Sequence, residues 1–179
     1  MCLLAIQFKL VADSPILVAC NRDEAYDREA LGPQIQSGKP RVLCAIDKRS
    51  GGTWLGVNQN GLFVGACNRI TYSSPLAPRS RGLLCRDLLR RNTARQAVDL
   101  AMNELGTNKY EGVNLIVADG DNGWIVHGGD NHQVVALREG LSIITNGDVN
   151  DPRDERIKLC RRLLTLQMLG ILYGGITGG

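Results

Sequence analysis

The first 24 residues, MCLLAIQFKLVADSPILVACNRDE, hold two short apolar runs that are separated by a turn. The runs are Leu3–Phe8 and Ile16–Cys20, and their composition is typical of β-strands. Asp13-Ser14-Pro15 lies between them and consists of residue types that favour turns. The stretch therefore predicts a β-hairpin whose second strand ends beside the start of the chain.

The predicted hairpin brings a polar tetrapeptide, Asn21-Arg22-Asp23-Glu24, close to Cys2. Aminopeptidases remove an initiator Met when the next residue is as small as Cys, and Cys2 would then carry a free α-amine. An α-amine has a pKa of about 8 and can accept the thiol proton without help from a histidine. Arg22 would favour the thiolate, and Asp23 would orient the protonated amine.

The same residues allow a structural interpretation. Cys2 can be an ordinary residue of a buried strand, because Cys behaves as a small hydrophobe. Arg22 and Asp23 can belong to a solvated turn that an Arg–Asp ion pair stabilises. Position and composition alone leave both interpretations open.

The remainder of the chain groups its strands and helices into separate blocks, which predicts a layered α+β fold. Asp23–Pro40 is polar and contains Gly and Pro breakers, so it predicts a long surface loop. Thr93 is the expected cap of one helix, and Asp151 that of the last helix. The expected strands are Val42–Ile46, Thr53–Val57, Leu62–Cys67, Val113–Ala118, Trp124–His127, Val134–Leu137 and Leu141–Thr145, and the expected helices are Arg81–Arg91, Ala94–Leu105 and a last one from Pro152 toward Met168.

Length and composition bound the class of protein. A chain of 179 residues fits one domain, which we expect over residues 1–170, with a disordered Gly-rich tail over 171–179. The net charge of +3 with dispersed arginines argues against nucleic-acid binding. No apolar run is long enough to span a bilayer, and Lys9 and Asp13 end the first run too soon for a signal peptide. We therefore expect a cytoplasmic protein.

The six cysteines show no metal-binding pattern. Cys20, Cys44, Cys67 and Cys85 lie within apolar runs, and no Cys-x-x-Cys or Cys/His spacing indicates zinc. We expect no metal and no cofactor, and the sequence does not predict an oligomeric state.

Several further blocks accompany the start of the chain in a fixed order, and together they resemble the NRDE family, named after transport and Golgi organization. A single Asn-Arg-Asp-Glu tetrapeptide would be a weak signal, but the ordered set is strong and reaches to about Arg162. The blocks are Met1-Cys2-Leu3-Leu4, Asn21–Glu24, Gly51–Asn58 (GGTWLGVN), Ser80-Arg81-Gly82, Asn114–Asp119, Thr145-Asn146 and Asn150–Pro152.

This family resembles N-terminal-nucleophile (Ntn) hydrolases of the choloylglycine hydrolase and penicillin V acylase type, which are αββα sandwiches that cleave linear amides. The resemblance implies that Cys2 is the nucleophile, that its amine is the base and that Asp23 orients this amine. Arg22 corresponds approximately to an activating arginine. Asn68 and Asn146 match amide side chains around the oxyanion, where preorganised donors are needed, although Asn is also common in turns.

The resemblance also bears on the C-terminal part of the fold and on the expected function. Family members continue into further strands and a late block with an arginine, so the resemblance implies an αββα sandwich that lacks its C-terminal strands. We expect a cysteine Ntn amidohydrolase with a small-molecule substrate, a linear amide or thioester. The alternatives are a non-catalytic carrier or trafficking factor for haem or lipid on the same scaffold, and an inactive fragment.

Overall fold

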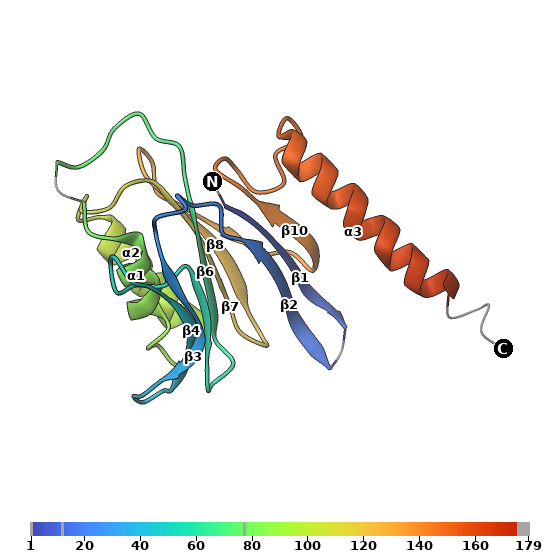
Figure 1. Cartoon of the computed structure of the whole chain (residues 1–179), viewed down its shortest axis with the longest axis horizontal. Helices are drawn as coiled ribbons and strands as arrows, with labels where there is room; N and C mark the ends of the chain where they lie inside the picture. The colour runs from blue at the N-terminus through green and yellow to red at the C-terminus, as the bar shows by residue number, and fades with distance from the viewer. Residues whose placement is uncertain (1, 12, 77, 175–179) are drawn as a thin grey trace.

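Two antiparallel sheets form the centre of the structure, which is a computed structural model that describes residues 2–11, 13–76 and 78–174 (Figure 1). The smaller sheet has the strand order β10-β1-β2, and the larger has the order β3-β4-β5-β6-β7-β8-β9. The elements in chain order are β1 (Leu3–Val11), β2 (Ser14–Asn21), β3 (Ala30–Gln36), β4 (Val42–Asp47), β5 (Leu55–Asn58), β6 (Phe63–Asn68), α1 (Arg81–Leu88), α2 (Ala94–Leu105), β7 (Val113–Ala118), β8 (Gly123–Gly128), β9 (Gln133–Ala136), β10 (Gly140–Ile144) and α3 (Glu155–Gly174).

The predicted hairpin is present and forms two of the three strands of the smaller sheet. Leu4 on β1 pairs with Cys20 on β2 and also with Ile144 on β10. The start of β1 and the ends of β2 and β10 therefore lie at one end of this sheet. Residues that follow these strand ends come together there.

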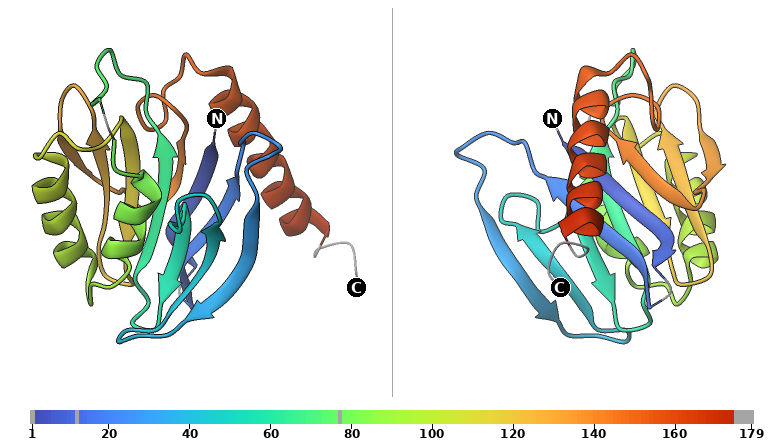
Figure 2. Two further views of the ribbon diagram at one scale, coloured as in Figure 1. Left: turned by 60° about the vertical axis from the view of Figure 1, so that its left-hand side comes forward. Right: turned by 90° about the vertical axis from the view of Figure 1, so that its right-hand side faces the viewer.

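Helices cover the outer face of each sheet, so the molecule has four layers in the order α, β, β, α (Figure 2). Helices α1 and α2 pack on the larger sheet through a buried cluster that includes Leu84, Leu88 and Val98. Leu4, Ile6 and Phe8 fill the space between the two sheets, together with Phe63, Cys67, Ile116 and Ile125. Helix α3 packs on the other face of the smaller sheet through Ile157, Cys160 and Leu164. The expected αββα sandwich is confirmed.

One predicted loop is wrong, because residues 30–36 within Asp23–Pro40 form strand β3. This strand pairs with β4 at the edge of the larger sheet. The register shifts between Leu31 and Gln34, so Gly32 and Pro33 lie at a bulge, where an edge strand tolerates proline. The strand is almost fully exposed. Gly32 and Pro33, which predict a loop, are accommodated at this edge position, and they hid the strand from the sequence pattern.

The last helix also differs from its prediction at both ends. It begins at Glu155 rather than Pro152, and Asp154 takes the capping role expected of Asp151, because Asp154 Oδ1 accepts from the backbone N–H of Arg156 at 2.9 Å. The helix reaches Gly174, so residues 171–174 belong to it and not to a disordered tail. Residues 175–179 lie outside the described residues.

The smaller sheet faces only part of the larger one. In the described chain, β2 is an edge strand, and a cavity of about 500 Å³ lies between it and the inner face of β3, β4 and β5. Apolar side chains around this edge are exposed, among them Leu17 at 59 %, Leu43 at 43 % and Val57 at 37 %. This open region borders the end of the sheet that carries Cys2.

Two of the sequence blocks meet where the larger sheet contacts α1. The backbone N–H of Thr53 donates to the carbonyl of Gly82 at 3.0 Å, and Arg86 donates to the carbonyl of Gly51 at 2.9 Å. A Cβ on Gly52 would lie 2.3 Å from the carbonyl carbon of Gly82. Gly52 therefore permits a backbone approach that no larger residue allows.

We predict that Gly52→Ala destabilises the protein by about 1–3 kcal/mol, because the methyl group forces α1 away from the sheet. Chemical denaturation measures the free energy of unfolding. Gly120→Ala is the matched control, because nothing lies within 4 Å of a Cβ built there. Equal stability of the two variants would contradict the close contact.

Candidate active site

Cys2 lies where two cavities of different character meet. A polar cavity of about 190 Å³ is lined by Cys2, Arg22, Asn68 and the start of α1. A larger groove of about 990 Å³ runs from Cys2 along α3, and Leu159, Leu163 and Leu166 line it. The thiol at the start of β1 thus borders both a polar and an apolar surface.

Arg22 is the residue that faces Cys2 across the hairpin. Leu3 pairs with Asn21, so the next position along the register sets Cys2 opposite Arg22, on the face that meets the larger sheet. The Arg22 guanidinium lies 4.7 Å from the ring centre of Trp54 and donates to the carbonyl of Arg28 at 3.2 Å. Its Nη2 is 3.9 Å from Asp47 and makes no hydrogen bond among the described residues.

Asp23 projects on the opposite face of the hairpin and lines the apolar groove with Arg156. Its side chain is exposed, and its charge acts on the Arg156 guanidinium. Asp23 therefore lies beside the start of β1 but on the α3 side of it, whereas Arg22 lies on the inner side.

Ion pairs balance the other charges of the polar cavity. Arg28 binds Asp47 at 2.7 Å and Glu24 at 3.2 Å, and Arg81 binds Glu111 at 3.2 Å. Although burial opposes the shift, hydrogen bonds from Arg28 and from backbone N–H groups lower the pKa of Asp47. The cavity is therefore lined by paired charges together with the Arg22 cation, and it suits a polar group.

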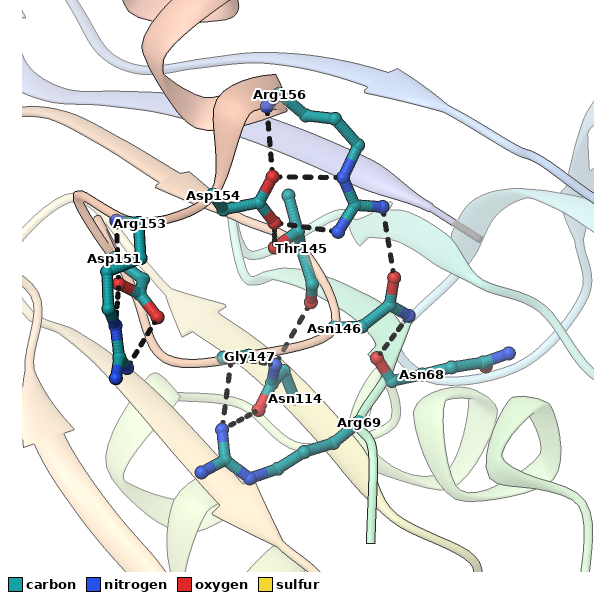
Figure 3. A network of polar contacts seen from close by, with 10 residues as sticks. All are labelled: Asn68, Arg69, Asn114, Thr145, Asn146, Gly147, Asp151, Arg153, Asp154 and Arg156. Carbon is teal, nitrogen blue, oxygen red and sulfur yellow. Dashed lines mark hydrogen bonds and ion pairs between the residues drawn. The ribbon is translucent and has the colours of Figure 1, made fainter.

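Asn68 and Asn146 come together, but they do not occupy equivalent places. Asn68 is exposed at the end of β6 and lines the polar cavity with Cys2. Asn146 is buried at 4 % exposure, lines neither cavity, and donates from Nδ2 to the Asn68 backbone carbonyl at 2.9 Å. The loop after β10 therefore holds the end of β6 in place (Figure 3).

A polar network at the start of α3 was not predicted from the sequence. Arg156 donates to Asp154 at 2.7 and 3.0 Å and to Asn146 Oδ1 at 3.2 Å, and the Thr145 hydroxyl donates to Asp154 at 2.7 Å (Figure 3). These hydrogen bonds hold the pKa of Asp154 well below its usual range. The sequence blocks Thr145-Asn146 and Asn150–Pro152 lie in this loop, but nothing in them indicated that Asp154 and Arg156 bind its residues.

A second part of the network lies behind the loop and includes a histidine. Asn114 donates to the carbonyls of Thr145 and Gly147 at 3.1 and 2.7 Å, and its Oδ1 lies 2.7 Å from His127 Nδ1. Because an amide oxygen only accepts, Nδ1 carries the proton. Burial and the nearby Arg69 cation lower the pKa of His127. His127 is thus a buried neutral residue on β8, with no contact to Cys2.

Burial affects the acidity of the five cysteines other than Cys2. Burial, with a smaller effect of Cys2, raises the pKa of the Cys20 thiol to about 11. Burial likewise raises the pKa values of Cys44, Cys67, Cys85 and Cys160. At neutral pH these five thiols stay protonated and are poor nucleophiles.

Within the described residues, no group of three or more His, Cys, Asp or Glu side chains is arranged to hold a metal ion. None of the helices there is both long and apolar enough to cross a membrane.

Comparison with known proteins shows the family. The family model described as "Transport and Golgi organisation 2" matches residues 1–167. The chain belongs to this family. Two curated members match, the transport and Golgi organization protein 2 homologs of Bos taurus and Homo sapiens, with 30 % and 28 % identity over 107 residues. The match covers 58 % of this chain and 38 % of each relative, so the chain spans well under half of their length.

Solved structures with the same fold include Ntn hydrolases. The Caenorhabditis elegans ortholog of N-acylethanolamine-hydrolyzing acid amidase superposes with a TM-score of 0.53 and 15 % identity, over 83 % of this chain and 70 % of that one. A variant of the conjugated bile acid hydrolase from Clostridium perfringens gives 0.55 and 13 %, over 83 % and 53 %. At such low identity these similarities establish the fold of this family member and nothing of its chemistry.

We predict that His127 makes stability depend on pH. Its folded-state pKa lies below the ordinary 6.5, so the neutral ring contributes stability that is fully present above pH 6.5 and is lost as the pH falls through the folded-state pKa. Denaturation of the wild type should show a free energy of unfolding that declines as the pH falls below about 6.5. His127→Gln should flatten that decline, and His132→Gln should leave it unchanged. A wild-type curve that is flat over this range would contradict the prediction.

Proposed function

We propose that this protein is a cysteine Ntn amidohydrolase that acts on a linear amide or thioester, with Cys2 as nucleophile after removal of Met1. The observation that carries the proposal is the place of Cys2, opposite Arg22 and at the boundary between an apolar groove and a polar cavity. The shared fold with Ntn hydrolases supports it.

The proposed reaction uses the chain's own groups. The free α-amine of Cys2 accepts the thiol proton, and the thiolate attacks the substrate carbonyl carbon to form a tetrahedral oxyanion. The oxyanion collapses as the carbon–nitrogen bond breaks, and the α-ammonium returns the proton to the leaving amine. Water, deprotonated by the same amine, then hydrolyses the thioester and regenerates Cys2.

Arg22 and Asp23 lie on opposite faces of the hairpin, and we assign each a different role in supporting Cys2. Arg22 faces the thiol side, where its cation favours the thiolate. Asp23 lies on the α3 side, beside the start of β1, where a carboxylate can accept from the α-ammonium of Cys2 and orient it.

The geometry favours Asn68 over Asn146 as the direct oxyanion donor. Asn68 lines the cavity that also contains Cys2, whereas Asn146 stands behind it and binds its backbone carbonyl. An amide N–H that lines such a cavity can donate to the developing charge on the oxyanion.

The two cavities favour a substrate with one apolar and one polar end. The leucines of the α3 groove would bind the apolar acyl part, and the small polar cavity would bind the polar leaving group. The names of the two fold neighbours, an N-acylethanolamine-hydrolyzing amidase and a conjugated bile acid hydrolase, are compatible with such an amide. We also propose the cytoplasm as its compartment.

We predict that Cys2 is the only cysteine on which activity depends. Intact-mass analysis should show that Met1 is absent, and an acyl electrophile should modify Cys2 first, because burial suppresses the other thiols. Turnover on a panel of N-acyl amides and acyl thioesters should disappear in Cys2→Ala. Cys160→Ala is the control, because Cys160 lines the same groove. Retained Met1, or a panel that stays silent with the wild type, would refute the proposal.

We predict that Asn68→Ala lowers kcat by about 10²–10³ because it removes an oxyanion donor. Asn103→Ala on the exposed face of α2 is the control and should leave kcat unchanged. Steady-state kinetics with the best substrate of the panel make the measurement. A change confined to KM would show that Asn68 binds the substrate and does not stabilise the oxyanion.

A further inference from the structure

Arg156 is the residue that connects the two sides of Cys2. It lines the apolar groove with Cys2 and Asp23, and it donates to Asn146, which binds the carbonyl of Asn68 in the polar cavity. A contact chain therefore runs from the start of α3 to the edge of the polar cavity.

The chemistry of the contacts fixes the orientation of the Asn146 amide. A guanidinium has only donors, so Arg156 can bind the Oδ1 end of the amide and not the Nδ2 end. A carbonyl only accepts, so Asn68 can bind only the Nδ2 end. A flipped amide would set an oxygen against the Asn68 carbonyl and an NH2 group against the guanidinium, and it would lose both bonds.

Arg156 itself is held from several directions. Asp154, two residues earlier, binds the guanidinium through both carboxylate oxygens at 3.0 and 2.7 Å, and the Thr145 hydroxyl holds Asp154 in turn. Such a two-point pair constrains the plane of the guanidinium more than a single contact does. The hydrogen bonds with Asp154, and the charges of Asp154 and Asp23, raise the pKa of Arg156.

We propose that Arg156 is a positioning residue of the site, which fixes Asn146 and, through it, the place of Asn68 beside Cys2. The expected effect of Arg156 on kcat rests on the proposed function, whereas its positioning of Asn146 does not. Arg156 is held at the junction of β10 and α3, so a ligand in the groove that displaced it would also loosen the end of β6.

The kinetic test compares Arg156→Met, Arg156→Lys and the control Arg153→Met. Arg153 is 84 % exposed and pairs with Asp151 in the same loop. Arg156→Met should lower kcat by up to about 10²-fold with little change in KM, because misplacing a group by about 1 Å has that effect. Arg156→Lys keeps one donor and should recover part of the loss, and Arg153→Met should match the wild type.

A double-mutant cycle shows whether Arg156 acts through Asn146. In the Asn146→Ala background, Arg156→Met should have no further effect on kcat, because the contact it supports is already absent. Additive losses, a wild-type kcat in Arg156→Met, or a loss confined to KM would overturn the proposal, the last because it indicates direct contact with the substrate.

A second readout does not depend on turnover and separates failure of this inference from failure of the proposed function. In protein labelled with nitrogen-15 asparagine, the Asn146 side-chain NH2 signals, assigned by their loss in Asn146→Ala, should be protected from solvent exchange. Arg156→Met should shift these signals and remove the protection, while Arg153→Met leaves them unchanged. Unaltered Asn146 signals in Arg156→Met would overturn the positioning role even if no substrate were found.

Discussion

The structure depends on the register of β1 between β2 and β10. Leu4 pairs with Cys20 on one side and Ile144 on the other, and this register sends Leu4, Ile6 and Phe8 toward the larger sheet. Burial of each of these side chains contributes about 1.5–3 kcal/mol. A slip of one residue would turn all three toward α3 and would move Cys2 away from Arg22. The packing that stabilises the sandwich is therefore also what places the candidate nucleophile.

The sequence predicted the elements whose residues show a clear period, and it missed those that tertiary contacts define. Helix α2 has the predicted bounds and its Thr93 cap, and β7 runs over the predicted residues, because both have strong apolar patterns. Strand β3 lies in a segment that the sequence predicts as a loop, because Gly32 and Pro33 look like breakers, and only the bulge at the sheet edge accommodates them. The cap of α3 was placed at Asp151 because a good cap followed by Pro152 looks like a helix start, yet the chain turns once more before Asp154.

The residues of the candidate site divide in the same way, into those that the local sequence predicts and those that only tertiary contacts bring together. The juxtaposition of Cys2 with Arg22 could be predicted, because a hairpin brings its two ends together whatever the rest of the chain does. The proximity of Asn68 and Asn146 was implied only by resemblance, since it requires strands from different sheets to meet. Arg156 could not be predicted, because its contacts depend on where α3 begins and on the path of the preceding loop. Contacts between residues that are far apart in the sequence leave no pattern in either local segment.

The surfaces around Cys2 are apolar on one side and polar on the other, and this difference helps to distinguish a carrier from a nucleophilic site. A carrier for an apolar ligand needs the leucine-lined groove, but it has no need of a thiol at the groove's end or of a polar cavity beyond it. Burial raises the pKa of five of the six thiols. Cys2 lies at the strand end, opposite Arg22, whose guanidinium stacks on Trp54. A molecule that spans the boundary between groove and cavity must place its own polar–apolar junction beside this thiol. In a linear acyl amide, that junction is the carbonyl carbon, which is the atom that a nucleophile attacks.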